Sequence, residues 1–565
     1  MEPDYRKLEF PYVRCGDQHA REPVRHPIVV VGAGPVGLTA AIDLAQQGVR
    51  VVVVDEDNKL STGSRAICFA KRTLEIWDRL GCGERMVQKG VSWNVGKVYF
   101  RDDLVYTFDL LPEPGHHRPA FVNLQQYYCE GFLYEHAKSF ANIELRWSNK
   151  VVGIEAGLDG ALLNVETPDG AYDLYADYVI ACDGARSSIR SFIGEASKGR
   201  TFHDRFLIAD VKMDAAFPPE RWFWFDPPFH RNQSTLLHRQ PDNVWRIDFQ
   251  LGADADPDLE KRPERVTPRI RALLGDDAQF TLEWVSVYTF SCVRMEKFRH
   301  GRILFAGDAA HCVSPFGARG ANSGVQDAEN LAWKLKLVLT GKAPDALLDS
   351  YSDERVYAAD ENIRCSTRAT DFITPKNRVS RTFRDATLKL AREFAFARRL
   401  VNSGRLSTPA ILRESALNTP DCDAFEGDMV PGAPSADAPI VVRGNASWLL
   451  AHVGGAFNGV YFSAGSIPFE TRERFADLAR DEVPVDVIVV LPTEAAAADS
   501  TEGLPIIDDR EGLVHRRFDA RPGTFYLLRP DQHVCARWRR FDTESARAAV
   551  RRATGVDNQR APCPH

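Results

Sequence analysis

The feature that most constrains this chain is a glycine-rich turn, Gly32-Ala33-Gly34-Pro35-Val36-Gly37, placed between two apolar segments. Residues 27–34 predict a buried parallel strand, and residues 37–48 have the apolar spacing of a helix that ends at a glycine. In such a unit the first glycine permits the tight turn and the second lets the backbone approach a pyrophosphate. The third lets the helix pack closely on the strand, and the helix N-terminus faces the anion.

A second buried strand, at residues 49–57, places Asp55 where a carboxylate can accept hydrogen bonds from an adenosine ribose. The two strands and the turn therefore predict a dinucleotide site, but they do not choose between FAD and NAD. A later segment favours FAD. The run from Gly301 to His311 predicts a strand followed by a small-residue turn, which delivers Asp308. A carboxylate there can bind a polyol, and FAD has a ribityl chain whereas NAD has none.

The residues after Asp308 predict the flavin end of the site. Pro315-Phe316-Gly317 and Gly320 lead into a helical stretch, residues 324–339. Its glycines allow a flat ring to approach, and a helix N-terminus stabilises negative charge on a reduced flavin. A third motif, Cys182-Asp183-Gly184-Ala185-Arg186, ends another apolar strand, and its polar side chains can bind phosphate or ribose hydroxyls.

Composition limits the classes of function. The chain has 565 residues, 44% hydrophobic and 26% charged, with a net charge of −7, which predicts several globular domains and no nucleic-acid partner. We expect a cytoplasmic protein because no segment has the roughly 20 apolar residues of a membrane span and the first 26 residues lack an apolar signal core. The eleven cysteines lack CxxC pairs and metal-ligand spacing, so no metal site is expected.

The three motifs, in this order, resemble the class A flavoprotein aromatic monooxygenases, which share the para-hydroxybenzoate hydroxylase fold. Arg65-Ala66 and Arg72-Thr73-Leu74-Glu75 resemble the branch of phenol hydroxylase and 3-(3-hydroxyphenyl)propionate hydroxylase. The resemblance covers about residues 27–390. Residues 427–434 and 521–538 resemble the thioredoxin-like domain fused to phenol hydroxylase and polyketide hydroxylases.

The resemblance implies an α/β fold with an α+β insert: a Rossmann-like FAD-binding domain, an inserted antiparallel substrate sheet and a C-terminal thioredoxin-like domain. The expected boundaries are an N-terminal arm at 1–26, the FAD-binding domain at 27–98, 127–203 and 290–392, the substrate-binding domain at 99–126 and 204–289, and the C-terminal domain at 400–565. Cys535 has no CxxC partner, so the last domain is expected to be non-redox, with a structural or homodimer-contact role.

The resemblance also implies the reaction. NADH or NADPH reduces FAD, O2 adds to form a flavin hydroperoxide, and one oxygen is transferred to a phenolic or other electron-rich ring. The residues implied for the cofactor are Gly32, Gly34, Pro35, Gly37, Asp55, Glu56, Arg65, Gln126, Asp183, Gly307, Asp308, Pro315, Gly320, Ala321 and Asn322. A single GxGxxG motif fits a family in which the nicotinamide cofactor binds without a fold of its own.

Aromatic and polar residues of the expected insert are candidates for substrate contact. They are Trp222, Trp224, His230, His238, Arg246 and Tyr288, of which His238 and Tyr288, together with Pro315, are the catalytic candidates. Which strand positions face the substrate depends on a parity that the sequence leaves open. Some phenol hydroxylases use an Asp near the position of Ile67 to ionise the phenol, and isoleucine cannot do this. Arg319 replaces the Gln of many relatives, and it is expected either to bind an anionic substrate or to pair with a surface carboxylate.

Two other hypotheses about the function remain open. Trp222-Phe223-Trp224-Phe225-Asp226-Pro227 resembles the Trp-x-Trp-x-Ile-Pro signature of flavin-dependent halogenases, but Asp226 replaces the isoleucine. Halogenases also have Asp-x-Ser-Gly where this chain has Asp183-Gly184-Ala185-Arg186, and they require a substrate lysine that is not recognisable here. The other reading is a non-hydroxylating flavoprotein, such as a reductase of isoprenoid double bonds. The aromatic, His- and Arg-rich insert argues against its long apolar tunnel.

Overall fold

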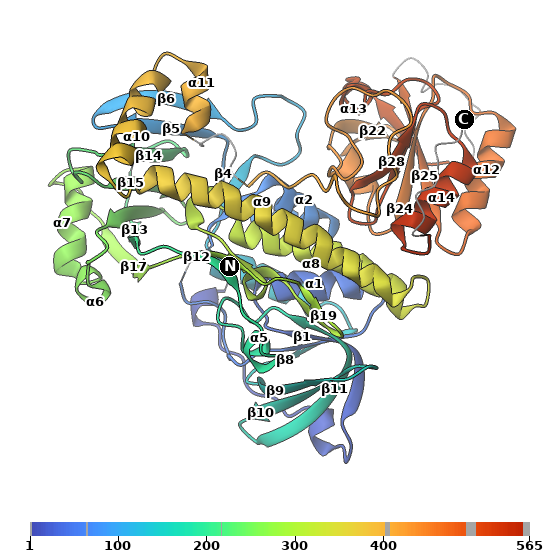
Figure 1. The fold of residues 1–565 in the computed structure, drawn as a ribbon, viewed down its shortest axis with the longest axis horizontal. Helices are drawn as coiled ribbons and strands as arrows, with labels where there is room; N and C mark the ends of the chain where they lie inside the picture. Colours follow the sequence, from blue (N-terminus) through green and yellow to red (C-terminus); the bar gives the residue numbers. More distant parts are fainter. Residues whose placement is uncertain (1–2, 64–65, 216, 402–406, 493–503, 558–565) are drawn as a thin grey trace.

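The computed structural model describes residues 3–63, 66–215, 217–401, 407–492 and 504–557. The fold is mixed α/β. Two long helices, α8 (Gly320–Leu339) and α9 (Asp349–Ile373), run across the middle of the molecule (Figure 1). The three large sheets lie around these helices, and the C-terminal one is set to one side in Figure 1. No helix in the described ranges is both long enough and apolar enough to cross a bilayer.

The first large sheet has eight strands, with the order β19-β20-β11-β1-β2-β8 and with β10 and β9 continuing from β11. Its strands are β1 (Val24–Val31), β2 (Val51–Val54), β8 (Ile143–Arg146), β9 (Lys150–Ala156), β10 (Ala161–Thr167), β11 (Gly170–Ala181), β19 (Arg299–His300) and β20 (Ile303–Phe305). The central strands pair in parallel, and all four valines of β2 are buried, as expected of a sheet covered on both faces. The hairpin predicted near Thr167 and Gly170 joins β10 to β11.

Helix α1 (Pro35–Gln46) packs against α8 and α4 (Gln126–Ala137). The same region contains α2 (Lys71–Arg79), α3 (Gly83–Lys89) and α5 (Ser188–Phe192). The N-terminal segment is anchored to it. Tyr5 is almost fully buried beside Phe132 of α4, and Phe10 stacks on Trp147. The segment that was expected to be an arm therefore packs on α4 and on the end of β8, and its last residues already form the start of β1.

The second large sheet has the order β17-β13-β16-β15-β14-β5-β6. Its strands are β5 (Val95–Phe100), β6 (Asp103–Asp109), β13 (Arg205–Lys212), β14 (Arg221–Phe225), β15 (Ser234–Arg239), β16 (Val244–Leu251) and β17 (Thr281–Tyr288). The expectation of a purely antiparallel sheet is wrong at one pair, because β14 runs parallel to β5. These two strands are joined by a long crossover through the eight-stranded sheet rather than by a hairpin. Helices α6 (Pro257–Glu260) and α7 (Pro263–Leu274) lie beside this sheet (Figure 1).

Two small sheets connect the large ones. One contains β3 (Cys68–Ala70), β7 (Phe121–Asn123) and β4 (Val91–Trp93), and the other contains β12 (Lys198–Thr201), β18 (Ser291–Arg294) and β21 (His311–Cys312). The seven-stranded sheet starts at Val95, before the expected boundary at residue 99, while β7 pairs outside it. Helices α10 (Arg378–Ala391) and α11 (Ala395–Leu400) follow α9, and α10 contacts β6.

The C-terminal sheet has the order β23-β22-β26-β25-β24-β27-β28. Its strands are β22 (Pro439–Val442), β23 (Asn445–Trp448), β24 (Phe457–Phe462), β25 (Val485–Pro492), β26 (Ile506–Asp509), β27 (Phe525–Leu528) and β28 (Val534–Trp538). Helices α12 (Phe469–Arg480) and α14 (Thr543–Ala553) pack in one core cluster, and α13 (Leu513–Arg517) packs in another. Trp333 of α8 belongs to the first of these clusters, so the C-terminal sheet shares a core with the central helix.

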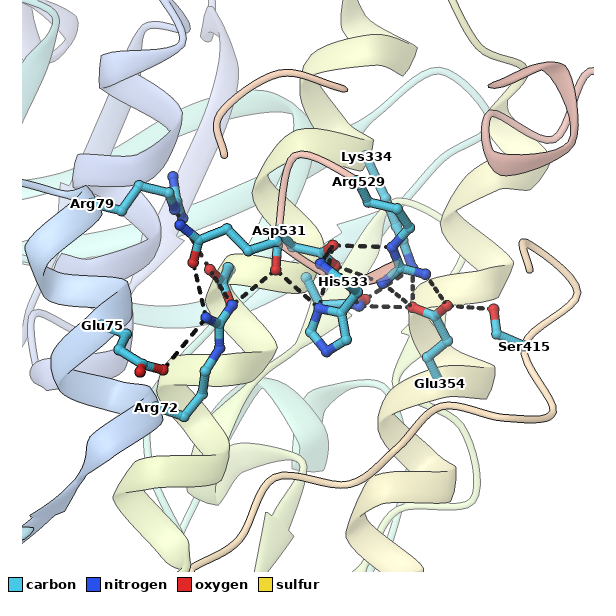
Figure 2. A network of polar contacts seen from close by, with 12 residues as sticks. Arg72, Glu75, Arg79, Lys334, Glu354, Ser415, Arg529, Asp531 and His533 are labelled. Atoms are coloured by element: carbon cyan, nitrogen blue, oxygen red, sulfur yellow. Dashed lines mark hydrogen bonds and ion pairs between the residues drawn. The ribbon is translucent and has the colours of Figure 1, made fainter. Parts of the chain in front are cut away.

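A buried ion network links the C-terminal sheet to the central helices (Figure 2). The turn between β27 and β28 contributes Arg529 and Asp531. Arg529 binds Glu354 of α9 at 2.6 Å and Asp531 at 2.6 Å, while Lys334 of α8 binds Glu354 at 2.8 Å. On the other side of the turn, Arg72 of α2 donates to the Asp531 carbonyl. The C-terminal turn thus forms an ion pair with α9 through Arg529 and accepts a hydrogen bond from α2 through the Asp531 carbonyl.

Candidate functional site

The glycine-rich turn has the geometry that its sequence predicted. Gly32 has φ +106°, and a Cβ there would lie 2.5 Å from the Cys182 carbonyl oxygen of the neighbouring strand. A Cβ on Gly37 would lie 2.0 Å from the Gly32 carbonyl oxygen, so this glycine lets α1 pack against the turn. A Cβ on Gly34 would meet nothing within 4 Å. Gly34 is also the N-cap residue of α1 and provides no side-chain cap, and Pro35 occupies the first turn. The start of α1 is therefore open to an anion.

Asp55 follows β2 and is tied to this turn. Its carboxylate accepts hydrogen bonds from the backbone N–H groups of Ala33 at 2.6 Å and Asp57 at 2.8 Å. Burial raises the pKa of Asp55 to about 6, although both backbone donors act in the opposite direction. Glu56 is exposed and lies 3.6 Å from Lys150. Of the two acids expected to bind the cofactor here, Asp55 is the one held at the glycine turn.

A polar cluster surrounds the start of α4. Gln126 donates to Glu130 at 2.8 Å and to Ser61 at 3.1 Å, and its oxygen accepts from the backbone N–H of Ala66 at 3.0 Å. These bonds tie Ser61 and Ala66 to the start of α4. Arg65, predicted to contact FAD or the nicotinamide cofactor, lies outside the described residues.

Asp183 and Asp308 follow neighbouring strands of the first sheet, β11 and β20. Asp183 Oδ2 accepts from the backbone N–H of Ile189, whereas Oδ1 is buried and has no hydrogen-bond partner. Burial raises the pKa of Asp183, and hydrogen bonds from Ser187 and the nearby backbone oppose that effect. Asp308 is exposed, and its Oδ1 lies 3.8 Å from the position of a Cβ on Gly320. Asp308 is therefore close to the start of α8.

Asp327 is a buried carboxylate that the sequence analysis did not single out. Its Oδ2 accepts from the backbone N–H of Gly307 at 3.0 Å and lies 2.7 Å from His311 Nε2, and its Oδ1 accepts from Arg355 Nε at 2.6 Å. Burial alone would raise its pKa, but His311 and Arg355 outweigh burial and lower the pKa to about 2. The only indication in the sequence is an acidic residue within the predicted helix, at position 327. The chain must fold before this carboxylate lies beneath the turn that carries Asp308.

The segment between Pro315 and α8 is held in place from two sides. Asn322 is 1% exposed. Its amide donates to the Cys68 carbonyl at 2.9 Å and accepts from the Ala70 N–H at 2.8 Å, which joins α8 to β3. Arg319 is also buried and donates to Asn362 of α9 at 2.8 Å, so it does not lie at the surface, where one of the two expectations placed it. Gly320 and Ala321 begin α8, which has no side-chain cap.

The seven-stranded sheet presents polar side chains from Arg221, His238, Arg246, Asp248 and Tyr288, here called the polar face. Strand pairing sets His238 beside Arg246, and Arg246 beside Asp210. The register of β14 and β15, with Trp222 opposite Leu237, continues to Arg221 opposite His238. The four residues Arg221, His238, Arg246 and Asp210 thus form a row across four strands.

Only part of the polar face is internally paired. Arg246 forms a bidentate ion pair with Asp210, with both N–O distances 2.8 Å. His238 Nε2 lies 4.0 Å from Asp248 Oδ2, while His238 Nδ1 and Asp248 Oδ1 are buried without hydrogen-bond partners. Burial, Arg221 and Arg246 hold the pKa of His238 well below its usual range. Burial raises the pKa of Asp248 to about 6.

Burial and the charge of Asp248 hold the pKa of Tyr288 well above its usual range. The phenol of Tyr288 is therefore protonated at neutral pH.

The other aromatic candidates lie elsewhere. Trp222 and Trp224 alternate with Arg221 along β14 and pack with Phe249 and the α7 residue Val266, in the cluster on the opposite face of the sheet. His230 binds the Gln250 carbonyl at 2.6 Å. The structure brings His238, Arg246 and Tyr288 together, but it does not bring Trp222, Trp224 or His230 to them.

The sheet that carries the polar face contacts two segments near the start of α8: the one that begins at Pro315, and strand β3. Phe316, the residue after Pro315, packs on Phe206 of β13 and on Phe290, with ring centroids 4.8 and 5.4 Å apart. Cys68 of β3 interacts electrostatically with Arg221 and Asp248. Since the Cys68 carbonyl is bound by Asn322, β3 connects the start of α8 to the polar face.

A family model described as FAD binding domain matches residues 25–366. A curated relative from Mycolicibacterium smegmatis, named 3-(3-hydroxy-phenyl)propionate/3-hydroxycinnamic acid hydroxylase, is 30% identical over 362 residues, which is 64% of each chain. The chain thus matches slightly less than two thirds of that relative's length. An Escherichia coli protein of the same name is 26% identical over 522 residues and covers 90% of this chain and 91% of its own.

Among solved structures, the flavin-dependent monooxygenase PieE, in complex with FAD and substrate, superposes with a TM-score of 0.80 at 23% identity. The match covers 95% of this chain and all of that chain. At this identity, the likeness is one of fold.

Proposed function

The chain belongs to the FAD binding domain family of flavin-dependent monooxygenases, and from this premise we propose that it hydroxylates a phenolic aromatic substrate. The balanced reaction consumes one NAD(P)H, one proton and one O2. It gives a ring with one added hydroxyl group, NAD(P)+ and water. The observation that carries the proposal is the polar face, with its unpaired His238 and Asp248 atoms, lying against the segment that begins at Pro315.

The residues at the glycine turns fit FAD. The open start of α1 at Gly34 accommodates a pyrophosphate, and Asp55 lies at the ribose end of that turn. The unpartnered Oδ1 of Asp183 and the exposed Asp308 supply acceptors for hydroxyl groups of the cofactor. Gly320, Ala321 and Asn322 present the backbone N–H groups of the α8 start to an anionic ring. When bound, FAD supplies the electron transfer from NAD(P)H and the activation of O2.

The chain's own contribution to the chemistry is positioning and proton transfer. We assign His238 as the acceptor of the substrate hydroxyl proton, because its neutral imidazole has a buried, unpartnered Nδ1. Asp248, 4.0 Å from Nε2, stabilises the positive charge that develops on the ring. Tyr288 donates a hydrogen bond to the substrate. Pro315 and Phe316 bring the segment before α8 against this face and exclude water.

The remaining assignments concern the domains. We assign the seven-stranded sheet as the substrate-binding insert and residues 400–565 as a thioredoxin-like domain without redox activity. Cys535 supports the latter because it is a free, fully buried thiol whose pKa is raised to about 12 by burial. We further propose that the protein acts in the cytoplasm, where NAD(P)H is available, and that the C-terminal domain provides a homodimer contact.

The proposal is tested with purified, FAD-loaded protein. A panel of phenols, including 3-(3-hydroxyphenyl)propionate, is screened for stimulation of NADH and NADPH oxidation, with hydrogen peroxide and product masses measured in parallel. At least one phenol should accelerate oxidation about tenfold or more and gain one oxygen atom. A protein that never oxidises NAD(P)H directly would point to a halogenase that needs a separate reductase, and oxidation without oxygen transfer to any ring would point to a reductase.

A further inference from the structure

Helices α10 and α11 carry a concentration of exposed apolar side chains. Among the described residues, thirteen large hydrophobic side chains are exposed, and six of them fall within residues 379–400. These six, here called the apolar stripe, are 45–79% exposed: Val379, Phe383, Leu390, Phe394, Phe396 and Leu400. Single exposed hydrophobic side chains are common on soluble proteins, whereas a group of them on neighbouring elements marks an interaction surface.

Helix α10 has two apolar sides, and only one of them faces the protein. Leu388 and Ala391 are buried in the core cluster beneath the helix. Val379, Phe383 and Leu390 occupy positions i, i+4 and i+11, which lie together on another side of an α-helix. Packing on the protein requires only the first of these sides, so the second is available to a partner.

Helix α11 extends the apolar stripe. Phe394 and Phe396 contact each other with ring centroids 5.8 Å apart, while Ala397 between them and Leu400 is buried. Helix α11 contacts α10, and α10 contacts β6, the edge strand of the seven-stranded sheet. Figure 1 shows the two helices together beside β5 and β6. The apolar stripe therefore covers one end of this sheet.

Basic side chains border the apolar stripe. Residues 378–400 contain seven basic and two acidic residues, a net charge of +5, although the whole chain carries −7. Five of the basic residues are exposed, and they are here called the basic row: Arg378, Arg381, Lys389, Arg392 and Arg399. The four on α10 lie along one side of the helix by their spacing. Arg392 pairs with Asp103, and within the described residues no carboxylate forms an ion pair with the other four.

The charge of the basic row indicates which partner fits the apolar stripe. Two copies of the chain that paired through this same surface would bring like charges together, which opposes association. An anionic bilayer offers negative headgroups to the basic row and an apolar interior to the stripe. Long Lys and Arg side chains reach headgroups while neighbouring Phe and Leu side chains enter the acyl boundary.

We propose that α10 and α11 attach the protein reversibly to the surface of an anionic lipid membrane. The helices lie on the bilayer, with the apolar stripe inserted and the basic row at the headgroups. The attachment places one end of the seven-stranded sheet at the membrane. It requires neither cofactor nor substrate chemistry, so it stands or fails independently of the proposed hydroxylase function.

The test measures vesicle binding by the full, FAD-loaded chain. Vesicles of phosphatidylcholine alone and of phosphatidylcholine with roughly 30% phosphatidylglycerol are separated from free protein by flotation. The apparent Kd should be at least about tenfold lower for the anionic vesicles. Raising the salt concentration from about 0.1 to about 0.5 M should weaken binding about fivefold or more, because salt screens exposed charges.

The apolar contribution is tested with the double variant Phe383→Gln, Phe396→Gln. It should bind anionic vesicles about tenfold or more weakly, since less apolar area enters the bilayer. The matched control is Phe192→Gln, Phe469→Gln, which changes two phenylalanines that are exposed elsewhere, by 43% and 69%. The control should bind like the wild type. Because all four positions are exposed, FAD absorbance and melting temperature should stay at the wild-type values.

The charge contribution is tested with Lys389→Gln, Arg399→Gln, against the control Lys59→Gln, Arg271→Gln at exposed positions elsewhere. The first pair should reduce the preference for anionic vesicles about fivefold or more, and the control pair should keep it.

Three outcomes overturn the inference: no vesicle binding by the wild type, equal binding to both kinds of vesicle, or unchanged binding by either test variant. Sedimentation velocity without lipid identifies the alternative. A wild-type dimer that Phe383→Gln, Phe396→Gln dissociates, together with absent vesicle binding, would make the apolar stripe a contact between copies of the chain.

Discussion

At the residue scale, the site depends on a few polar atoms that the fold leaves unpaired. Most buried polar groups in a folded protein find a partner, and the polar face has three atoms that do not: Nη1 of Arg221, Nδ1 of His238 and Oδ1 of Asp248. They come from three adjacent strands and surround the same region. By contrast, both carboxylate oxygens of nearby Asp210 accept hydrogen bonds from Arg246. The contrast separates groups that stabilise the sheet from groups that are available to a ligand.

The pKa of Asp248 leads to a prediction about pH. Since burial raises that pKa to about 6, the carboxylate is ionised only above this pH. We expect kcat/KM for a phenolic substrate to rise with pH through an apparent pKa of about 6. Asp248→Asn should lower kcat/KM at pH 8 and remove this limb, whereas Asp254→Asn, at an exposed position, should keep it.

The sign for stability is opposite. The folded-state pKa of Asp248 lies above the ordinary aspartate value of 3.8, so ionisation destabilises the fold as pH rises from about 4 to about 6. Asp248→Asn should therefore raise the melting temperature at pH 8. An unchanged acid limb in this variant would assign the titration to another group.

At the element scale, two helix starts lie at the end of the site where we propose that the nucleotide binds. Both α1 and α8 begin without a side-chain cap, so their first N–H groups can meet a ligand. Their supports differ. The turn before α1 is shaped by Gly32 and Gly37, where a Cβ would collide with a backbone oxygen, whereas α8 is fixed by the Asn322 bridge to β3 and by Asp327 beneath Gly307.

The glycines before α1 should separate folding from cofactor binding. Gly34→Ala adds a methyl group to open space, so the protein should fold but bind FAD at least about tenfold more weakly, since the methyl group occupies the approach to the pyrophosphate. Gly37→Ala should not fold, because its Cβ would lie 2.0 Å from a backbone oxygen. Circular dichroism and FAD titration of the apoprotein check both, with Gly465→Ala, also in open space, as the control. Tight FAD binding by Gly34→Ala would contradict the assignment.

At the scale of the whole molecule, the C-terminal sheet is joined to the central helices by buried charges. Glu354 accepts from Arg529 and Lys334, and together they lower its pKa although burial raises it. A lowered carboxylate pKa contributes stability above the unfolded value of 4.5, and that contribution is lost as pH falls. The junction should therefore weaken in acid before the apolar cores do.

Removing one cation tests this junction. Arg529→Met leaves Glu354 and Asp531 buried with less compensation, and we expect a loss of about 3 kcal/mol or more. The thermal unfolding transition of the C-terminal region, followed by circular dichroism and limited proteolysis, should move to lower temperature. Arg516→Met, at an exposed arginine of α13, should behave like the wild type. Equal behaviour of the two variants would mean that apolar packing around Trp333 holds the regions together.

Much of the nucleotide-binding region could be predicted from sequence, because its constraints are local. The positive φ of Gly32, the close packing at Gly37 and the four-valine strand each follow from a few neighbouring residues. The family match over residues 25–366 agrees with the three motifs. The substrate side was less predictable. Trp222 and Trp224 drew attention as an aromatic pair, yet it is the adjacent Arg221 that shares the polar face with His238.

The sequence by itself determined where the strands, turns and dinucleotide motif lie, since backbone conformation and apolar periodicity are local properties. Only the tertiary structure decided which side of each strand faces the site. A shift of one residue in pairing exchanges the two faces, and pairing is set by partners far away in the chain. The same holds for α8, whose charged Asp327, Glu329 and Lys334 suggest a solvated side but are buried by α9, α2 and the C-terminal turn. Charges from separate segments can neutralise one another only after the chain has brought them together.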